Sequence, residues 1–122
     1  MSKNNVGKVY RGRTKYINPE TKHERNYVVV RDNGKSVAVA KLKYVKKEND
    51  PALLEIDYRK YPLSKRTGVD FQQFGLNRMS KKPLKLSDRS VFPESFERFK
   101  LSSHDTHKVL IHTRRKKKKP RQ

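Results

Sequence analysis

Residues Asn26 to Val45, which read NYVVVRDNGKSVAVAKLKYV, decide the fold. The two halves of this stretch are rich in β-branched and aromatic residues, which favour strands. Between them lies the pair Asn33-Gly34, and both residue types accept the positive φ angles of a tight hairpin turn. The sequence therefore predicts two antiparallel strands, 26–31 and 36–45, joined by that turn.

The second strand of the hairpin has two different faces, because successive side chains of a strand point to opposite sides of the sheet. One face carries Ala38, Ala40, Leu42 and Tyr44, and the other carries Val37, Val39, Lys41 and Lys43. The first face is expected to be core. Lys41 and Lys43 project together from the second face. They either line a groove that binds a polyanionic backbone or belong to an ordinary solvent-exposed strand face.

Shorter strand signals flank the hairpin. Apolar and β-branched runs predict a first strand over 7–11, further strands over 53–56 and 69–74, and a final strand over 108–113. The polar stretch 13–25 predicts a loop. Many short strands with little material for a second layer predict a mainly β fold, a small SH3-like or OB-like barrel with one or two short helices.

Three phenylalanines predict one of these helices. Phe92, Phe96 and Phe99 recur at positions i, i+4 and i+7, and Pro93 stands at a suitable first helical position. Because the chain is poor in apolar residues, these three side chains and Phe71 are expected to pack in the core.

The charge of the chain predicts an anionic partner. With 122 residues the chain has the size of one domain, and 32 Lys and Arg against 12 Asp and Glu give a net charge of +20. The C-terminal run 114–122, RRKKKKPRQ, repels itself and is expected to be a disordered polybasic tail. Without its seven positive charges, +13 of the +20 remains on the domain 1–113, which predicts a positively charged working surface.

Several features of the sequence exclude other classes of protein. The chain contains no cysteine, which excludes disulfides and thiolate zinc sites. Its longest apolar runs, Tyr27 to Val30 and Val37 to Ala40, are far shorter than the roughly 20 residues of a membrane helix. The N-terminus lacks the apolar segment of a signal peptide. We therefore expect a cytoplasmic protein without a membrane partner.

A cluster of histidines near the C-terminus invites a metal or acid-base interpretation. His104, His107 and His112 lie close in sequence to Asp105, and imidazole is well suited to proton transfer near neutral pH. The segment 102–106, however, is typical of a polar turn before a strand. A histidine in a polar loop is the commoner outcome, so we predict neither a metal nor another cofactor and leave the role of these histidines open.

Basic residues interleaved with aromatic ones are typical of surfaces that bind single-stranded nucleic acid. Bases stack on the aromatic rings while phosphates pair with lysine and arginine. The basic candidates are Lys41, Lys65, Arg66, Arg78, Lys81, Lys82, Arg114 and Arg115, and the tyrosines that are candidates for stacking are Tyr16, Tyr44 and Tyr58.

Several strings, in their order along the chain, resemble the PemK/MazF-type toxins. Gly7 to Tyr10 resembles the family's opening Gly-Asp-Val-Tyr, and Arg25 to Val30 resembles its Arg-Pro followed by a valine-rich strand. The later strings that resemble the family are 37–45, Glu55-Ile56, Tyr61-Pro62-Leu63, Gln73 with Arg78, and 81–84. The resemblance covers about residues 7–84.

This resemblance implies an SH3-like barrel, usually a homodimer, that cleaves single-stranded RNA without a metal and is held inactive by an antitoxin, here expected to be acidic. Such cleavage needs a base for the 2′-hydroxyl, an acid for the leaving oxygen and a cation for the phosphoryl charge. Carried over by position, the catalytic candidates are Arg25, which matches the family's arginine, and Lys43, which stands where the family has Thr or Ser. Asn26 replaces the family's proline, and Lys8 replaces its acidic residue.

These departures leave three functions open. The first is a PemK/MazF-like RNA-binding protein that is an endoribonuclease. The second is a non-enzymatic nucleic-acid-binding accessory protein of a mobile element, which fits Lys43 because lysine binds phosphate but supplies no hydroxyl. The third is a ribosome-associated structural protein, which the composition alone favours. The first two require Arg25, Lys41 and Lys43 to line one trough on a curved β scaffold.

Overall fold

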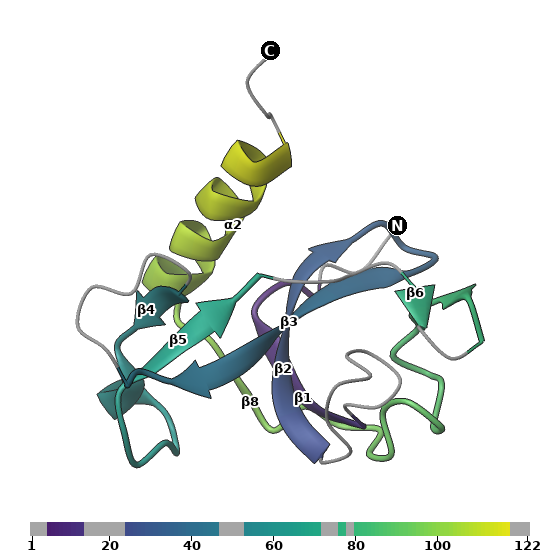
Figure 1. Cartoon of the computed structure of the whole chain (residues 1–122), viewed down its shortest axis with the longest axis horizontal. Coiled ribbons are helices and arrows are strands. Elements are labelled where there is room, and N and C mark those ends of the chain that lie inside the picture. Colours follow the sequence, from purple (N-terminus) through teal and green to yellow (C-terminus); the bar gives the residue numbers. More distant parts are fainter. Residues whose placement is uncertain (1–4, 14–23, 47–52, 72–75, 78–79, 118–122) are drawn as a thin grey trace.

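The computed structural model describes residues 5–13, 24–46, 53–71, 76–77 and 80–117. It shows a curled, six-stranded antiparallel sheet that forms half of a barrel, with one long helix packed at the end where β4 and β5 lie (Figure 1). The sheet order is β4-β5-β3-β2-β1-β8. The prediction of a small, mainly β barrel fold is confirmed.

The elements are numbered in their order along the chain. The strands of the large sheet are β1 (Lys8–Arg13), β2 (Glu24–Asp32), β3 (Val37–Tyr44), β4 (Leu53–Ile56), β5 (Thr67–Asp70) and β8 (Phe99–Lys100). A 3-10 helix, η1 (Tyr58–Lys60), precedes β5, and a small hairpin pairs β6 (Leu76–Asn77) with β7 (Lys82–Pro83). The long helix is α2 (Ser103–Lys117).

The predicted hairpin is the centre of the sheet. Strands β2 and β3 pair antiparallel from Tyr27 opposite Lys41 to Asp32 opposite Val37. In the turn, the Oδ1 atom of Asn33 accepts hydrogen bonds from the backbone N–H groups of Lys35 at 2.9 Å and Ser36 at 2.8 Å. Gly34 there has a φ of 90°, which a residue without Cβ adopts at little cost.

The central strands are buried on both sides, because the sheet carries a hydrophobic cluster on each face. A bulge in β2 between Val29 and Arg31 adds one residue, and bulges increase the local twist of a sheet. One cluster includes Val28, Ala40, Leu42, Val69 and Val109 of α2, and the other includes Tyr27, Val29, Val39 and, from the segment before β8, Leu84 and Phe92. At the end of β3 Leu42 is buried and Lys43 is exposed as predicted, but Tyr44, expected on the core face, is exposed.

The helix predicted from the three phenylalanines is wrong. The segment that contains them is irregular up to β8, and the three rings have different surroundings. Phe92 is buried in the second cluster, Phe99 packs against the first, and Phe96 is 60% exposed rather than in the core. Phe71 is buried as expected. Phe92 and Phe99 therefore serve opposite faces of the sheet, and Phe96 serves neither.

The strand predicted over 108–113 is also wrong, because these residues lie in α2. Asp105, Val109 and Thr113 are buried at positions i, i+4 and i+8, which places them on one face of the helix. The Oγ atom of Ser102 accepts a hydrogen bond from the N–H of Asp105 at 3.2 Å and caps the helix. The segment 102–106, expected to be a polar turn, is therefore the start of α2.

Helix α2 also changes the predicted division between domain and tail. It continues to Lys117, so the boundary expected between Thr113 and Arg114 lies inside the helix. The C-terminal part of α2 extends beyond the sheet (Figure 1). Three segments lie outside the described residues: 118–122, residues 14–23 of the loop predicted over 13–25, and residues 72–74 of the strand predicted over 69–74. Within the described part of the chain, no helix is long and apolar enough to cross a membrane.

Candidate nucleic-acid interface

A cleft opens where β2 and β3 separate. Their pairing ends at Tyr27 opposite Lys41. Beyond that point the start of β2 stays with β1, where Asn26 pairs with Arg11, while the end of β3 turns to β5, where Tyr44 pairs with Thr67. Because the two strands leave each other, side chains from both faces of the sheet reach the opening.

The cleft has a volume of about 500 Å³. Its lining residues are Arg11, Arg25, Asn26, Lys41, Leu42, Lys43, Tyr44, Lys46, Leu63 and Thr67. Five of these ten residues are basic, and none is acidic. The structure thus brings together the three residues that the sequence analysis required in one trough, Arg25, Lys41 and Lys43, and it adds Tyr44 from the stacking candidates.

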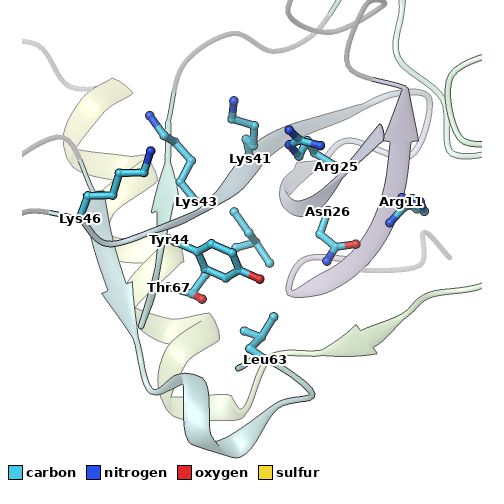
Figure 2. A pocket seen from close by; sticks show the side chains of 10 residues that line it. Arg11, Arg25, Asn26, Lys41, Lys43, Tyr44, Lys46, Leu63 and Thr67 are labelled. Carbon is cyan, nitrogen blue, oxygen red and sulfur yellow. The ribbon is translucent and has the colours of Figure 1, made fainter. Parts of the chain in front are cut away.

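The cationic groups are arranged as a rim. Figure 2 shows the ends of Arg25, Lys41, Lys43 and Lys46 directed to the same side of the opening. Below this row the side chains of Asn26, Tyr44, Thr67 and Leu63 form the interior of the cleft (Figure 2). A polyanion that follows the rim would therefore lie above these four uncharged side chains, while the fifth cation, Arg11, lies apart from the row, beside Asn26 (Figure 2).

One acidic residue holds part of this rim in place. The buried Asp70 carboxylate lies 3.6 Å from the Nζ atom of Lys43, and Asp70 pairs with Lys41 across the strands. The Lys43 side chain remains 47% exposed, so it can meet an anion in solvent while Asp70 restricts its position. Asp70 does not itself line the cleft.

The tyrosine of the cleft is placed for stacking. The side chain of Tyr44 is 49% exposed although the ring is large and apolar. The Nζ atom of Lys65 lies 5.4 Å from the centre of that ring, which is a cation–π distance. Lys65, a predicted binding residue, thus stands beside the cleft without lining it.

Other depressions have mixed charge. The depression beside η1 contains Glu55 and Asp57 together with Arg59, Arg66 and Lys108. The depression at the hairpin turn contains Asp32 together with Lys35 and Lys85. Of these three depressions, only the cleft between β2 and β3 concentrates one sign of charge, which focuses an attractive field on anions.

Several predicted binding residues lie elsewhere. Arg66 donates to both Glu55 oxygens, at 2.7 and 3.0 Å, and these hydrogen bonds lower the pKa of Glu55. Lys81 and Lys82 are exposed at the hairpin of β6 and β7. Tyr58 lies at the depression beside η1. Arg114 and Arg115 lie in α2. Tyr16 and Arg78 lie outside the described residues.

Sequence reasoning missed several residues of the cleft. Arg11 and Lys46 add two cations, and Thr67 adds a hydroxyl that donates to the Lys65 carbonyl oxygen at 2.8 Å. Arg11 could have been found from the pairing of the first two strands, because it lies directly opposite Asn26. Thr67 could not, since its approach to Tyr44 depends on which strand pairs with the end of β3.

The histidine cluster does not assemble. His104 and His107 are exposed on α2, whereas Asp105 is buried on the opposite side and His112 stacks near Phe71 with ring centres 4.3 Å apart. Among the residues that the structure describes, no three His, Asp or Glu side chains gather as a metal site requires.

Comparison of the chain with protein-family models, with curated proteins and with solved structures finds no match in any of the three. The resemblance to PemK/MazF-type toxins thus stays a prediction from the sequence strings. Fold and site define a half-open β-barrel with one cationic, aromatic-containing cleft.

Proposed function

We propose that the protein binds single-stranded RNA in the cleft between β2 and β3. The observation that carries this proposal is the lining of the cleft, whose described residues include five cations and a half-exposed tyrosine but no carboxylate. Phosphates attract the cations, and unstacked bases offer a partner for the ring of Tyr44. The net charge of +20 adds a long-range attraction for any polyanion.

The aromatic ring favours a single strand over a duplex. In a duplex the bases are stacked on one another inside the helix, and only their edges are accessible in the grooves. The ring of Tyr44 lies among the cleft residues below the cationic rim, so it meets a base face only where a base has left the stack (Figure 2). A strand with unpaired bases supplies such faces at each nucleotide.

Binding without cleavage is the form of this function that the described residues support. Arg25 and Lys43 could stabilise phosphoryl charge, and Tyr44 carries an acidic hydroxyl. The described lining contains no histidine or carboxylate that could take the proton of a 2′-hydroxyl. An endoribonuclease would need a proton-accepting group for the 2′-hydroxyl from another part of the chain.

A binding assay tests the proposal and separates it from the enzyme. Labelled single-stranded RNA of about a dozen nucleotides is titrated with the protein in EDTA and compared with a duplex of the same sequence. We expect tighter binding of the single strand, an affinity that falls steeply with salt, and intact RNA. Equal binding of the duplex would contradict the proposal, and cutting that Arg25→Ala abolishes would establish the endoribonuclease instead.

The resemblance also implies a homodimer and an acidic antitoxin, and both stay predictions. An acidic partner is compatible with the cationic rim, because a negatively charged segment could occupy the same cleft as RNA. If such a partner displaces bound RNA in a competition assay, both bind at the cleft.

A further inference from the structure

The side chain of Asn26 is an unusual feature of the cleft. Its Oδ1 atom is buried and accepts no hydrogen bond from any of the described residues. A buried acceptor without a donor destabilises the folded protein, so most proteins satisfy such atoms. An unsatisfied amide oxygen at the edge of a cleft is the arrangement expected where a ligand supplies the missing donor.

The local strand geometry places Asn26 at the opening of the cleft. Asn26 lies one residue before the last β2–β3 pair, where the two strands have begun to separate. The β3 residue that would continue the register, Leu42, pairs with Val69 of β5 instead, and its apolar side chain carries no donor. Its paired neighbour on β1 is Arg11, which also lines the cleft.

The amide and the phenol of Tyr44 enter the same space. Figure 2 shows both polar ends directed into the opening between β2 and β3, below the row of cations. An amide presents an acceptor and a donor side by side, which matches the hydrogen-bonding edge of a nucleobase. A volume of about 500 Å³ lies within the usual range for small-ligand sites, roughly 300 to 1,000 Å³, and holds one nucleotide.

We infer that the cleft accepts one unstacked nucleobase, which stacks on Tyr44, and that the amide of Asn26 hydrogen-bonds to its edge and sets which base is preferred. The phosphates on either side of this nucleotide lie on the cationic rim. This inference rests on the proposed function and assigns a specificity-determining residue to it. The cations then supply affinity without regard to sequence, and Asn26 supplies the selection among bases.

The test measures base preference rather than overall affinity. Four short RNA strands that differ at one central nucleotide are titrated with wild-type protein, Asn26→Ala and Asn26→Leu, which has similar size without a polar group. We expect the wild type to prefer one base by roughly tenfold, since a two-hydrogen-bond amide contact discriminates by about 1 to 3 kcal/mol. Both variants should bind the four strands within about twofold of one another.

A variant at the ring checks the stacking partner. Tyr44→Leu is expected to weaken binding of all four strands by roughly tenfold, because base–aromatic stacking contributes about 1 to 3 kcal/mol per base. Phe96→Leu is the matched control, since Phe96 is more exposed than Tyr44 but lies outside the cleft. Far-ultraviolet circular dichroism confirms that each variant is folded.

The outcomes separate this inference from the proposed function. If the wild type has no base preference, or if Asn26→Ala and Asn26→Leu keep it, the inference is overturned while binding at the rim stands. If the wild type binds none of the four strands, the proposed function itself fails. The inference is supported if both Asn26 variants lose the base preference of the wild type and Tyr44→Leu binds all four strands more weakly.

Discussion

Replacement of Arg25, Lys41 and Lys43 together by glutamine is expected to lower the affinity for single-stranded RNA about fiftyfold at about 0.15 M salt. If each residue neutralises one phosphate, the slope of log affinity against log salt falls by about 2. At that salt concentration the lost counterion release corresponds to roughly fourfold per contact. Fluorescence anisotropy at four or five salt concentrations measures both the affinity and the slope.

A charge-matched control decides whether the cleft or the total charge is responsible. Lys35, Lys60 and Lys100 are exposed and lie outside the cleft, so their replacement by glutamine removes the same net charge. We expect this control to keep its salt slope within about half a unit of wild type. Equal losses in the two triple variants would show that binding depends on diffuse charge and not on the cleft.

Tyr61→Phe is expected to destabilise the fold by about 3 kcal/mol, because its hydroxyl joins a loop of the cleft to α2. The hydroxyl donates to Asp105 Oδ2 at 2.5 Å and accepts the Ser102 N–H at 2.9 Å. Asp105 is only 1% exposed, so loss of the donor leaves a buried carboxylate undersatisfied. Two residues further on, Leu63 lines the cleft. Thermal unfolding should show a melting temperature lower by roughly 10 to 20 °C.

The control for this variant is Tyr58→Phe. Tyr58 is half-buried in η1, and no hydrogen bond of its hydroxyl is found among the described residues. This variant should unfold within about 0.5 kcal/mol of wild type. If Tyr61→Phe were equally stable, the contact between Tyr61 and Asp105 would contribute nothing to the fold.

The same contact predicts a pH dependence. Burial, followed by the hydrogen bond to Asp105, raises the pKa of Tyr61 above its ordinary value of 10.0. Folding therefore favours the protonated phenol, and its contribution is complete below pH 10 and lost as the pH rises through the raised pKa. The difference in unfolding free energy between wild type and Tyr61→Phe should stay constant from pH 7 to about 9 and shrink above pH 10.

The part of the fold that could be predicted from the sequence is the part governed by local signals. The β2–β3 hairpin follows from an alternating apolar pattern and from the turn chemistry of Asn33 and Gly34. Lys41 and Lys43 project together for the same local reason. Arg25 joins them because hairpin pairing brings the start of β2 near the end of β3.

Helix α2 was missed because its buried face is partly polar. The run Val109-Leu110-Ile111 is β-branched and apolar and favours a strand, whereas two of the buried positions on α2 are Asp105 and Thr113. The buried Asp105 accepts a hydrogen bond from Tyr61, 44 positions earlier, and no local pattern reports that contact. Ser102 with Asp105 three positions later is a helix-start signal that could have indicated α2.

The interior of the cleft could not be predicted for a related reason. Whether a side chain lines the opening depends on where β3 leaves β2 for β5, which is a property of the whole sheet. Asn26 therefore stood out in the sequence only as a replacement of the family's proline. Only the three-dimensional structure shows that its Oδ1 atom is buried without a hydrogen-bond donor among the described residues.

Residue-resolved titration tests the central claim most directly. Amide chemical shifts of the labelled protein are followed as a short single-stranded RNA is added at moderate salt. We expect the largest shifts at Asn26, at Lys41 to Tyr44 and at Thr67, with little change at the hairpin turn around Asn33. Largest shifts at the β6–β7 hairpin or along α2, with an unchanged cleft, would contradict the assignment of the RNA site to the opening between β2 and β3.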